Sequence, residues 1–191
     1  IEDIDFTRCK PEFSKQLIDD LSWMGITFSD VSYQSQRLSL YQDALDKLIA
    51  LDVLYPCFCT RKAIQEHVPL SQIYVLDNYP KTCLSLSQRQ QEEAKKDSGF
   101  AWRLNTKKVE EMLGADLSWK DLDGVVHPFS ITDIGDVIIG RKDIHFSYHL
   151  AVVVDDAAQG MTHVIRGEDL RDSTLVHCVL QKLLNYAEPV Y

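Results

Sequence analysis

The stretch Tyr-His-Leu-Ala-Val-Val-Val-Asp-Asp-Ala-Ala-Gln-Gly-Met-Thr-His-Val-Ile-Arg-Gly-Glu-Asp-Leu-Arg-Asp, residues 148–172, decides the predicted fold. Residues 150–154 form an unbroken apolar run that stops abruptly at Asp155 and Asp156. A run of this length without alternation predicts a strand buried on both faces, as in a parallel sheet. A second strand is expected at 162–165, followed by a helix after Asp169.

Polar residues gather where these two predicted strands end. In open α/β sheets, ligands bind beyond the carboxyl ends of the strands. The pattern therefore predicts a polar ligand site, and two solvated loops are the alternative. The residues concerned are Asp155, Asp156, Arg166, Glu168 and Asp169.

The N-terminal part alternates predicted helices with extended segments. Pro11 suits a first helical turn and Gly25 suits a C-terminal cap, with Phe13, Leu17, Ile18, Leu21 and Met24 at helical spacing between them. An extended piece at 26–28, an amphipathic helix at 38–51 and a strand at 53–58 follow. This order is typical of an α/β layer fold, here a Rossmann-like domain with a parallel sheet.

The character of the chain changes at Pro56. Thr60 is a predicted N-cap of a helix through Glu66, and Ser87 with Gln90 resembles a capping box for a helix ending near Gly99. Strands are expected at 100–104 and 137–139, a helix at 107–113, and a hairpin joining 117–122 to 125–131. We therefore expect residues 1–55 and 136–191 to form the two parts of the Rossmann-like domain, with residues 56–135 as an inserted α+β subdomain.

Composition narrows the class of protein. The chain has 191 residues, 45% of them hydrophobic, which is enough for one sizeable core. A net charge of −9 argues against a general nucleic-acid coat protein. No signal peptide and no apolar run long enough to cross a bilayer are visible. Five cysteines at irregular spacing fit a reduced, cytoplasmic setting better than a disulfide framework.

Three of the cysteines are candidate metal ligands. Cys57 and Cys59 form a Cys-X-Cys pair, and Cys83 follows on a segment that a metal ion would pin. Zn²⁺ takes four thiolate, nitrogen or oxygen donors in a tetrahedron. From spacing alone the fourth donor is open among His67, Asp77, Tyr79 and a water molecule, and three unrelated buried thiols are the alternative.

An amino-acid pocket is the second candidate site. A guanidinium binds a carboxylate, a carboxylate binds an ammonium group, and a tyrosine hydroxyl binds either. Arg166, Glu2 and Tyr148 supply these three groups, although Arg166 and Glu2 could also form an internal ion pair. No phosphate-binding glycine loop and no Ser/His/Asp or Cys/His triad can be identified.

Five segments together resemble a known family. They are IEDID at 1–5, YQSQR at 33–37, CFCTR at 57–61, YPKTC at 79–83 and LAVVVDDAAQGMTHVIRGEDLRDST at 150–174. The chain is similar to the catalytic core of bacterial glutamyl-type class I aminoacyl-tRNA synthetases. The DLRDST segment favours the short paralogues of that family, because the full synthetases usually have a histidine where Leu170 stands.

The resemblance implies an activity and its residues. Members activate glutamate with ATP and Mg²⁺, and the short paralogues transfer it to the queuosine base of tRNA(Asp). By motif, Glu2, Tyr148 and Arg166 are implied glutamate-binding residues. Cys57, Cys59, Tyr79 and Cys83 are the implied zinc ligands, although the segment between Cys59 and Tyr79 is longer than the family pattern.

The family's ATP-binding motifs would lie before Ile1 and after Tyr191. We therefore expect the chain to be an inactive fragment of an active, monomeric, cytoplasmic enzyme. A full glutamyl-tRNA synthetase that charges the 3′ end, and a non-catalytic zinc-stabilised module, are the alternatives.

Overall fold

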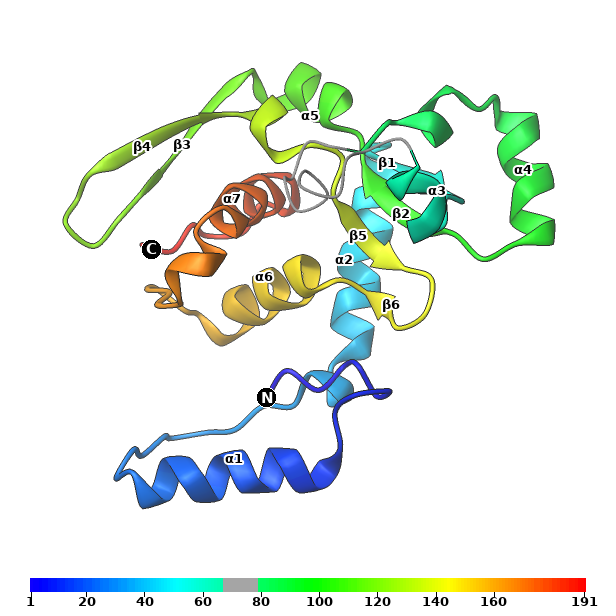
Figure 1. The fold of residues 1–191 in the computed structure, drawn as a ribbon. Helices are drawn as coiled ribbons and strands as arrows, with labels where there is room; N and C mark the ends of the chain where they lie inside the picture. The colour runs from blue at the N-terminus through cyan, green and yellow to red at the C-terminus, as the bar shows by residue number, and fades with distance from the viewer. Residues whose placement is uncertain (67–78) are drawn as a thin grey trace.

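The computed structural model describes residues 1–66 and 79–191, and its architecture mixes helices and strands (Figure 1). The α-helices are α1 (Pro11–Trp23), α2 (Leu38–Ala50), α3 (Arg61–Gln65), α4 (Gln88–Asp97), α5 (Thr106–Leu113), α6 (Tyr148–Gln159) and α7 (Ser173–Leu184). The strands are β1 (Leu54–Cys57), β2 (Ala101–Leu104), β3 (Asp116–Lys120), β4 (Val126–Ser130), β5 (Ile138–Arg141) and β6 (His145–Phe146). Short 3-10 helices are η1 (Gln34–Gln36), η3 (Thr82–Ser85), η4 (Ile131–Ile134) and η5 (Glu168–Leu170).

The main sheet has the strand order β1-β2-β5-β6, and every neighbouring pair is antiparallel. The predicted parallel sheet is therefore wrong for the part of the chain that the structure describes. Among the described residues the single parallel pairing is an isolated bridge between His163 and Val190. His163 lies in the segment predicted as the strand 162–165. A strand's own apolar pattern does not fix the direction of its partner, and the short β5–β6 connection permits only an antiparallel pair. The sheet also runs across both predicted subdomain boundaries.

Local sequence signals place most of the other elements correctly. The Thr60 hydroxyl accepts a hydrogen bond from the amide of Ala63 at the start of α3. Ser87 and Gln90 form the predicted capping box, because each side chain bonds the backbone amide of the other. The predicted hairpin is present as β3 and β4, and Gly124 has the positive φ of +81° that its turn requires.

Helix α6 corrects the central prediction. Residues 150–154, predicted as a strand, lie within this 12-residue helix. The hydroxyl of Ser147 accepts a hydrogen bond from the amide of Leu150, and Gly160 ends the helix with φ +68°. The apolar run is continuous because α6 is covered on several sides, and such a run does not distinguish a buried helix from a buried strand.

The core lies where α6 packs against α2 and α7. Tyr41 and Leu48 of α2, Leu150 of α6 and Leu180 of α7 are completely buried there. The predicted apolar stripe of α7 is largely confirmed, since Val176, Val179, Leu180 and Leu183 are all buried. Each buried leucine side chain contributes ~1.5–3 kcal/mol to stability through the hydrophobic effect. These helices therefore form the rigid support of the polar groups described below.

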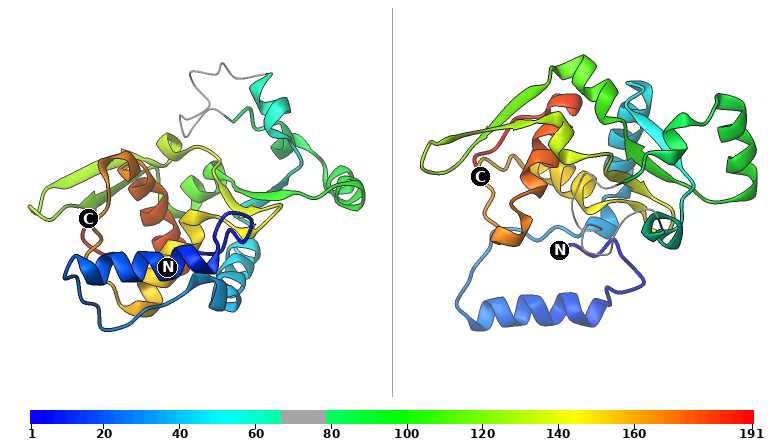
Figure 2. Two further views of the ribbon diagram at one scale, coloured as in Figure 1. Left: turned by 60° about the horizontal axis from the view of Figure 1, so that its bottom comes forward. Right: turned by 45° about the horizontal axis from the view of Figure 1, so that its top comes forward.

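Helix α1 forms where predicted, but it contains no buried residue. Phe13 is 58% exposed and Met24 is 65% exposed. In Figure 1 and the right panel of Figure 2, α1 lies apart from the packed helices, and extended segments lead into and out of it. The segment 26–28, predicted as extended, joins no strand. The apolar spacing thus sets a helix whose apolar residues are at most half-buried.

Candidate functional site

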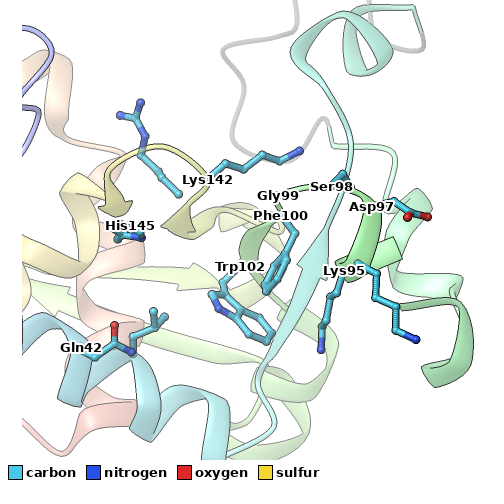
Figure 3. A pocket seen from close by; sticks show the side chains of 12 residues that line it. Gln42, Lys95, Asp97, Ser98, Gly99, Phe100, Trp102, Lys142 and His145 are labelled. Atoms are coloured by element: carbon cyan, nitrogen blue, oxygen red, sulfur yellow. The ribbon is translucent and has the colours of Figure 1, made fainter. Parts of the chain in front are cut away.

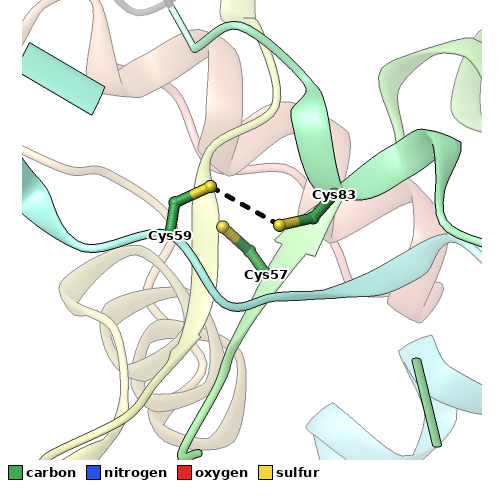
Figure 4. Close-up of side chains that lie close together, drawn as sticks. All are labelled: Cys57, Cys59 and Cys83. Carbon is green, nitrogen blue, oxygen red and sulfur yellow. Dashed lines mark hydrogen bonds between the residues drawn. The ribbon is translucent and has the colours of Figure 1, made fainter. Parts of the chain in front are cut away.

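The cysteine cluster consists of Cys57, Cys59 and Cys83 together with Tyr79. The three sulfur atoms all lie within 4.8 Å of one another (Figure 4). The hydroxyl oxygen of Tyr79 is 3.1 Å from the Cys57 sulfur and 3.4 Å from the Cys59 sulfur, and the sulfurs of Cys59 and Cys83 are 3.5 Å apart. Two other suggested fourth donors, His67 and Asp77, lie outside the described residues. The structure thus brings the four predicted ligands together.

Backbone geometry explains this convergence. Cys57 is the last residue of β1, and Cys83 lies on η3. The amide of Phe58 donates to the Cys83 sulfur at 3.3 Å. The ammonium group of Lys142, from the β5–β6 turn, donates to the carbonyls of Phe58 and Cys59 at 3.0 and 3.2 Å. Two distant segments therefore fix the turn that presents Cys59.

Protonation within the cluster is uneven. Burial raises the pKa of the Cys59 thiol to about 11. Burial acts to raise the pKa of the Cys83 thiol. Hydrogen bonds from the Phe58 amide, the Tyr79 hydroxyl and the Cys59 thiol outweigh this effect, so the pKa of Cys83 lies below its usual value. Burial raises the pKa of the Tyr79 hydroxyl. A metal ion would have to displace protons from these groups, so its affinity would increase with pH.

The cluster fits a tetrahedral metal ion. Zn–S bonds of ~2.3 Å at tetrahedral angles place neighbouring sulfurs about 3.8 Å apart. The observed sulfur separations are of this size, and no disulfide links any of the cysteines. Three thiols and one phenol oxygen supply four donors of a kind that Zn²⁺ accepts.

Asp136 braces the same region. Its buried carboxylate accepts hydrogen bonds from the hydroxyls of Tyr55 and Thr106 at 2.8 and 2.6 Å. Lys81, two residues before Cys83, lies 3.4 Å from this carboxylate. The Arg103 guanidinium donates to the Asp136 carbonyl at 2.6 Å and stacks 3.7 Å from the centre of the Tyr79 ring. The cysteine cluster is therefore held by a charged network on β1, β2 and α5.

The second predicted site begins with Glu2. The carboxylate of Asp3 accepts hydrogen bonds from the amide and hydroxyl of Ser35 at 2.9 and 2.7 Å. The Gln34 amide donates to the Ile1 carbonyl at 3.0 Å. Glu2 is thus fixed between two anchored neighbours, and its own side chain stays exposed beside the C-terminal half of α6.

Helix α6 presents the other groups of this site. Tyr148 begins the helix, and Asp156 lies two turns later on the same face. Asp155 is buried and accepts hydrogen bonds from Gln34, Arg37 and Tyr41. The strand-end explanation for Asp155 and Asp156 was wrong. Asp155 is a structural anchor, and Asp156 faces the predicted site.

Arg166 lies on the extended segment before η5 and is held from α7. Its Nη1 donates to Nδ1 of His177 at 2.8 Å, and its Nη2 donates to the hydroxyl of Thr174 at 3.3 Å. Its guanidinium carbon is 4.9 Å from the centre of the Tyr191 ring. The alternative for Arg166, an internal ion pair with Glu2, is not found among the ion pairs of the described residues.

Electrostatic coupling shows that these groups share one environment. Burial raises the pKa of the Tyr148 hydroxyl, Glu2 adds to the rise, and Arg166 opposes it. Burial raises the pKa of Asp156. The nearby Arg166 acts to lower this pKa, whereas Asp155 and Glu2 act to raise it further. Glu2 also has a raised pKa, through lost solvation and the nearby Asp155. Glu2, Tyr148, Arg166 and Asp156 therefore influence one another electrostatically, and Glu2 and Asp156 also line one cavity.

An acidic cavity of about 320 Å³ adjoins this group, between the N-terminal segment and α6. Glu2, Asp155 and Asp156 line it together with apolar residues of α1. Since Asp155 is engaged by Arg37, the carboxylates of Glu2, Asp156 and Asp30, which also lines the cavity, are the ones available to a cation. Arg166 lies outside the lining of this cavity, but its positive charge acts on Asp156 and lowers the pKa of that carboxylate.

A larger hollow of about 570 Å³ opens between α2, the α4–β2 connection and the β5–β6 turn (Figure 3). Its lining combines basic side chains with the rings of Phe100 and Trp102. Most of the charges already have partners. Lys95 pairs with Glu92 at 2.8 Å, and Arg141 pairs with Asp143 at 2.6 Å. We therefore assign no ligand to this hollow.

Sequence reasoning missed two members of the polar group. The sequence pattern assigns no role to His177 or His149, but the two form a hydrogen-bonded pair behind Arg166. The available signal was positional: His177 follows Thr174 by three residues, so both face the same way from α7.

Comparison with known proteins identifies the family. The family model described as tRNA synthetases class I (E and Q), catalytic domain, matches residues 1–191. A glutamyl-Q tRNA(Asp) synthetase of Rhodobacter capsulatus is 40% identical and one of Leptothrix cholodnii is 37% identical over all of this chain. The chain spans 71% and 64% of their lengths. A glutamate–tRNA ligase of Coprothermobacter proteolyticus is 32% identical, and the chain covers 41% of it.

The fold agrees with this relationship. The crystal structure of a glutamate–tRNA synthetase from Elizabethkingia anophelis matches the whole chain with a TM-score of 0.83 at 20% identity, covering 41% of that protein. The mixed α/β architecture is thus that of a class I synthetase catalytic domain, and the resemblance drawn from the sequence motifs is confirmed. The chain belongs to the class I tRNA synthetases of the glutamyl and glutaminyl family, within their catalytic domain.

Proposed function

We propose that the full-length protein activates L-glutamate with ATP and transfers it to the queuosine base of tRNA(Asp). The identities of 40% and 37% to proteins named for this reaction support the assignment. The observation that carries it is the cavity beside α6 that Glu2 and Asp156 both line, with Tyr148 and Arg166 near enough to act on these carboxylates. This grouping offers one cation, two carboxylates and a hydroxyl to a small zwitterion.

Each group has a chemical task in this proposal. The guanidinium of Arg166 binds a glutamate carboxylate, since no carboxylate of the described residues lies within 4.0 Å of it. Glu2 and Asp156 bind the ammonium group, and the Tyr148 hydroxyl bonds either end. The free glutamate carboxylate then attacks the α-phosphorus of ATP, and pyrophosphate leaves. ATP with Mg²⁺ is the second substrate, and we assign it no residue in this chain.

We also propose that the cysteine cluster holds a structural Zn²⁺ through Cys57, Cys59, Cys83 and Tyr79. The ion would fix η3 against β1, so that residues 56–135 act as a zinc-containing insert between residues 1–55 and 136–191. Four protein ligands leave no open position, which is typical of a structural rather than a catalytic site.

Partner and location follow from the same proposal. We expect a monomeric cytoplasmic enzyme that meets tRNA(Asp) as its macromolecular substrate. No helix in residues 1–66 and 79–191 is both long enough and apolar enough to cross a bilayer.

The test uses the full-length protein with labelled glutamate. Queuosine-containing tRNA(Asp) should accept glutamate, and the same tRNA carrying guanine at that position should not. Removal of the 3′-terminal adenosine should leave acceptance intact, because the anticodon base is the target. Failure to label the queuosine-containing tRNA would refute the proposal.

The alternative function is charging of tRNA(Glu) at its 3′ end. The relative named glutamate–tRNA ligase, at 32% identity, supports this alternative. In that case tRNA(Glu) would accept glutamate, and loss of its 3′-terminal adenosine would abolish acceptance. Pyrophosphate exchange that strictly requires tRNA(Glu) would favour the same alternative.

A further inference from the structure

We propose that His177 is a positioning residue, which together with His149 holds the Arg166 guanidinium in place for a substrate carboxylate without neutralising its charge. The inference rests on the proposed role of Arg166 in glutamate binding. Neither His177 nor His149 is among the proposed glutamate-binding residues.

Contacts from α7 define the orientation of Arg166. Nδ1 of His177 lies 2.8 Å from Nη1, and the Thr174 hydroxyl lies 3.3 Å from Nη2. Both partners are almost completely buried, at 2% and 3% exposure. They lie three residues apart, on one face of a helix whose neighbours form the core. Two nitrogens of the Arg166 guanidinium are therefore hydrogen-bonded to side chains of the buried helix α7.

Hydrogen-bond logic fixes every proton in this chain of groups. A guanidinium only donates, so Nδ1 of His177 must accept, and the ring proton must be on Nε2. That Nε2 lies 3.2 Å from Nδ1 of His149 and donates to it. His149 must then carry its own proton on Nε2. The order Arg166, His177, His149 thus has one consistent arrangement, with both imidazoles neutral.

The surroundings keep both rings neutral. Burial lowers the pKa of His149 to about 4, and the charge of Arg166 adds to this effect. Burial, His149 and Arg166 all lower the pKa of His177. The other ring packed against His177 is Tyr148, at 5.7 Å between centroids, and it carries no charge at neutral pH. No carboxylate among the described residues contributes to the shift of either histidine.

A neutral acceptor has a specific advantage here. A carboxylate partner would orient the guanidinium but also cancel much of its attraction for an incoming carboxylate. Imidazole nitrogen and threonine oxygen orient it and leave its full positive charge. They occupy two of its five N–H donors, so the remaining donors can bond to Tyr148 and to a ligand. His177 and Thr174 thus orient the Arg166 guanidinium without cancelling its positive charge.

The test compares two substitutions in the full-length protein. His177→Leu fills the space but cannot accept a hydrogen bond, whereas His177→Gln keeps an acceptor oxygen. We expect His177→Leu to raise KM for glutamate about tenfold, with KM for ATP unchanged in pyrophosphate exchange. His177→Gln should stay within about threefold of the wild type. A merely structural role would lower the active fraction without a selective change in KM for glutamate.

A second measurement needs neither variant. Nitrogen-15 NMR of the histidine-labelled full-length protein should show both rings neutral near pH 7, with protons on Nε2. A proton on Nδ1 of His177, or an unchanged KM for glutamate in a folded His177→Leu variant, would overturn the inference. Arg166→Ala separates the two proposals. If that variant also binds glutamate normally, the proposed site fails; if only His177→Leu does, the positioning role alone fails.

Discussion

Nε of Arg37 donates a 2.7 Å hydrogen bond to the carboxylate of Asp155, across 118 residues of sequence. Gln34 and Tyr41 donate to the same carboxylate, so one buried aspartate joins the 34–41 segment to α6. This segment also anchors the residues on both sides of Glu2. The relationship therefore connects the packing of the core to the geometry of the polar site.

Replacing Asp155 should destabilise the fold strongly. Asp155→Ala leaves a guanidinium, an amide and a phenol without their buried partner, which costs about 3–5 kcal/mol. Urea unfolding followed by tryptophan fluorescence measures this loss. The matched control is Asp19→Ala, which removes an exposed pair with Lys15 and should change stability by no more than about 0.5 kcal/mol. Equal effects of the two variants would contradict the anchoring role.

Metal content tests the cysteine cluster. We expect about one Zn²⁺ per chain in the purified protein, and Cys59→Ser or Cys83→Ser should abolish its retention. Cys9→Ser is the control, because Cys9 lies outside the cluster and should leave the zinc content unchanged. Elemental analysis gives the answer directly. Folded wild-type protein without zinc would exclude the proposed centre.

Arg166→Ala in the full-length protein should weaken glutamate binding by roughly 2–5 kcal/mol, because a binding charge is lost from a partly buried site. Arg171→Ala is the matched control, since that arginine is exposed, forms its ion pair with Glu168 and otherwise lies 6.0 Å from the centre of the Trp119 ring. Calorimetric titration with glutamate distinguishes the two variants. Parallel losses of affinity would indicate a general charge effect instead of a specific contact.

Stability should decrease as the pH falls below about 6.5, the ordinary pKa of histidine. The unfolded chain then binds a proton at His149, whereas in the folded protein the pKa of His149 is about 4. Because the unfolded state binds more protons in this window, the free energy of unfolding falls by about 3 kcal/mol between pH 6.5 and 4. His177 acts in the same direction.

Urea midpoints measured at pH 4.5, 5.5 and 7 test this pH dependence. His149→Phe removes the group that titrates and should flatten the dependence. If the slope is the same in His149→Phe, other groups are responsible for the acid sensitivity.

Helices with local signals could be predicted from the sequence. The Ser87–Gln90 capping box, Pro11 at the start of α1 and the apolar stripe of α7 each depend on neighbours within a few residues. The strand predicted at 150–154 failed because a helix buried on several sides has no amphipathic pattern. Ser147, which caps the start of this helix, is the one local signal in the sequence that favours a helix there.

Some residues of the candidate sites could likewise be predicted from the sequence, and others could not. Cys57, Cys59 and Cys83 could be named because thiols at short spacing have few other roles. The partners of Arg166 could not, because His149 lies 28 residues before His177 and their contact depends on how α6 packs against α7. Such contacts arise from tertiary packing and leave no periodic trace in the sequence.

The most direct test of the central claim is a crystal structure of the full-length protein with bound glutamate. We expect a glutamate carboxylate within about 3 Å of the Arg166 guanidinium, since charge-assisted hydrogen bonds are that short. Its ammonium group should lie against Glu2 or Asp156, with the His177 contact to Arg166 retained. Glutamate bound with no contact to Arg166, Glu2 or Tyr148 would contradict the account.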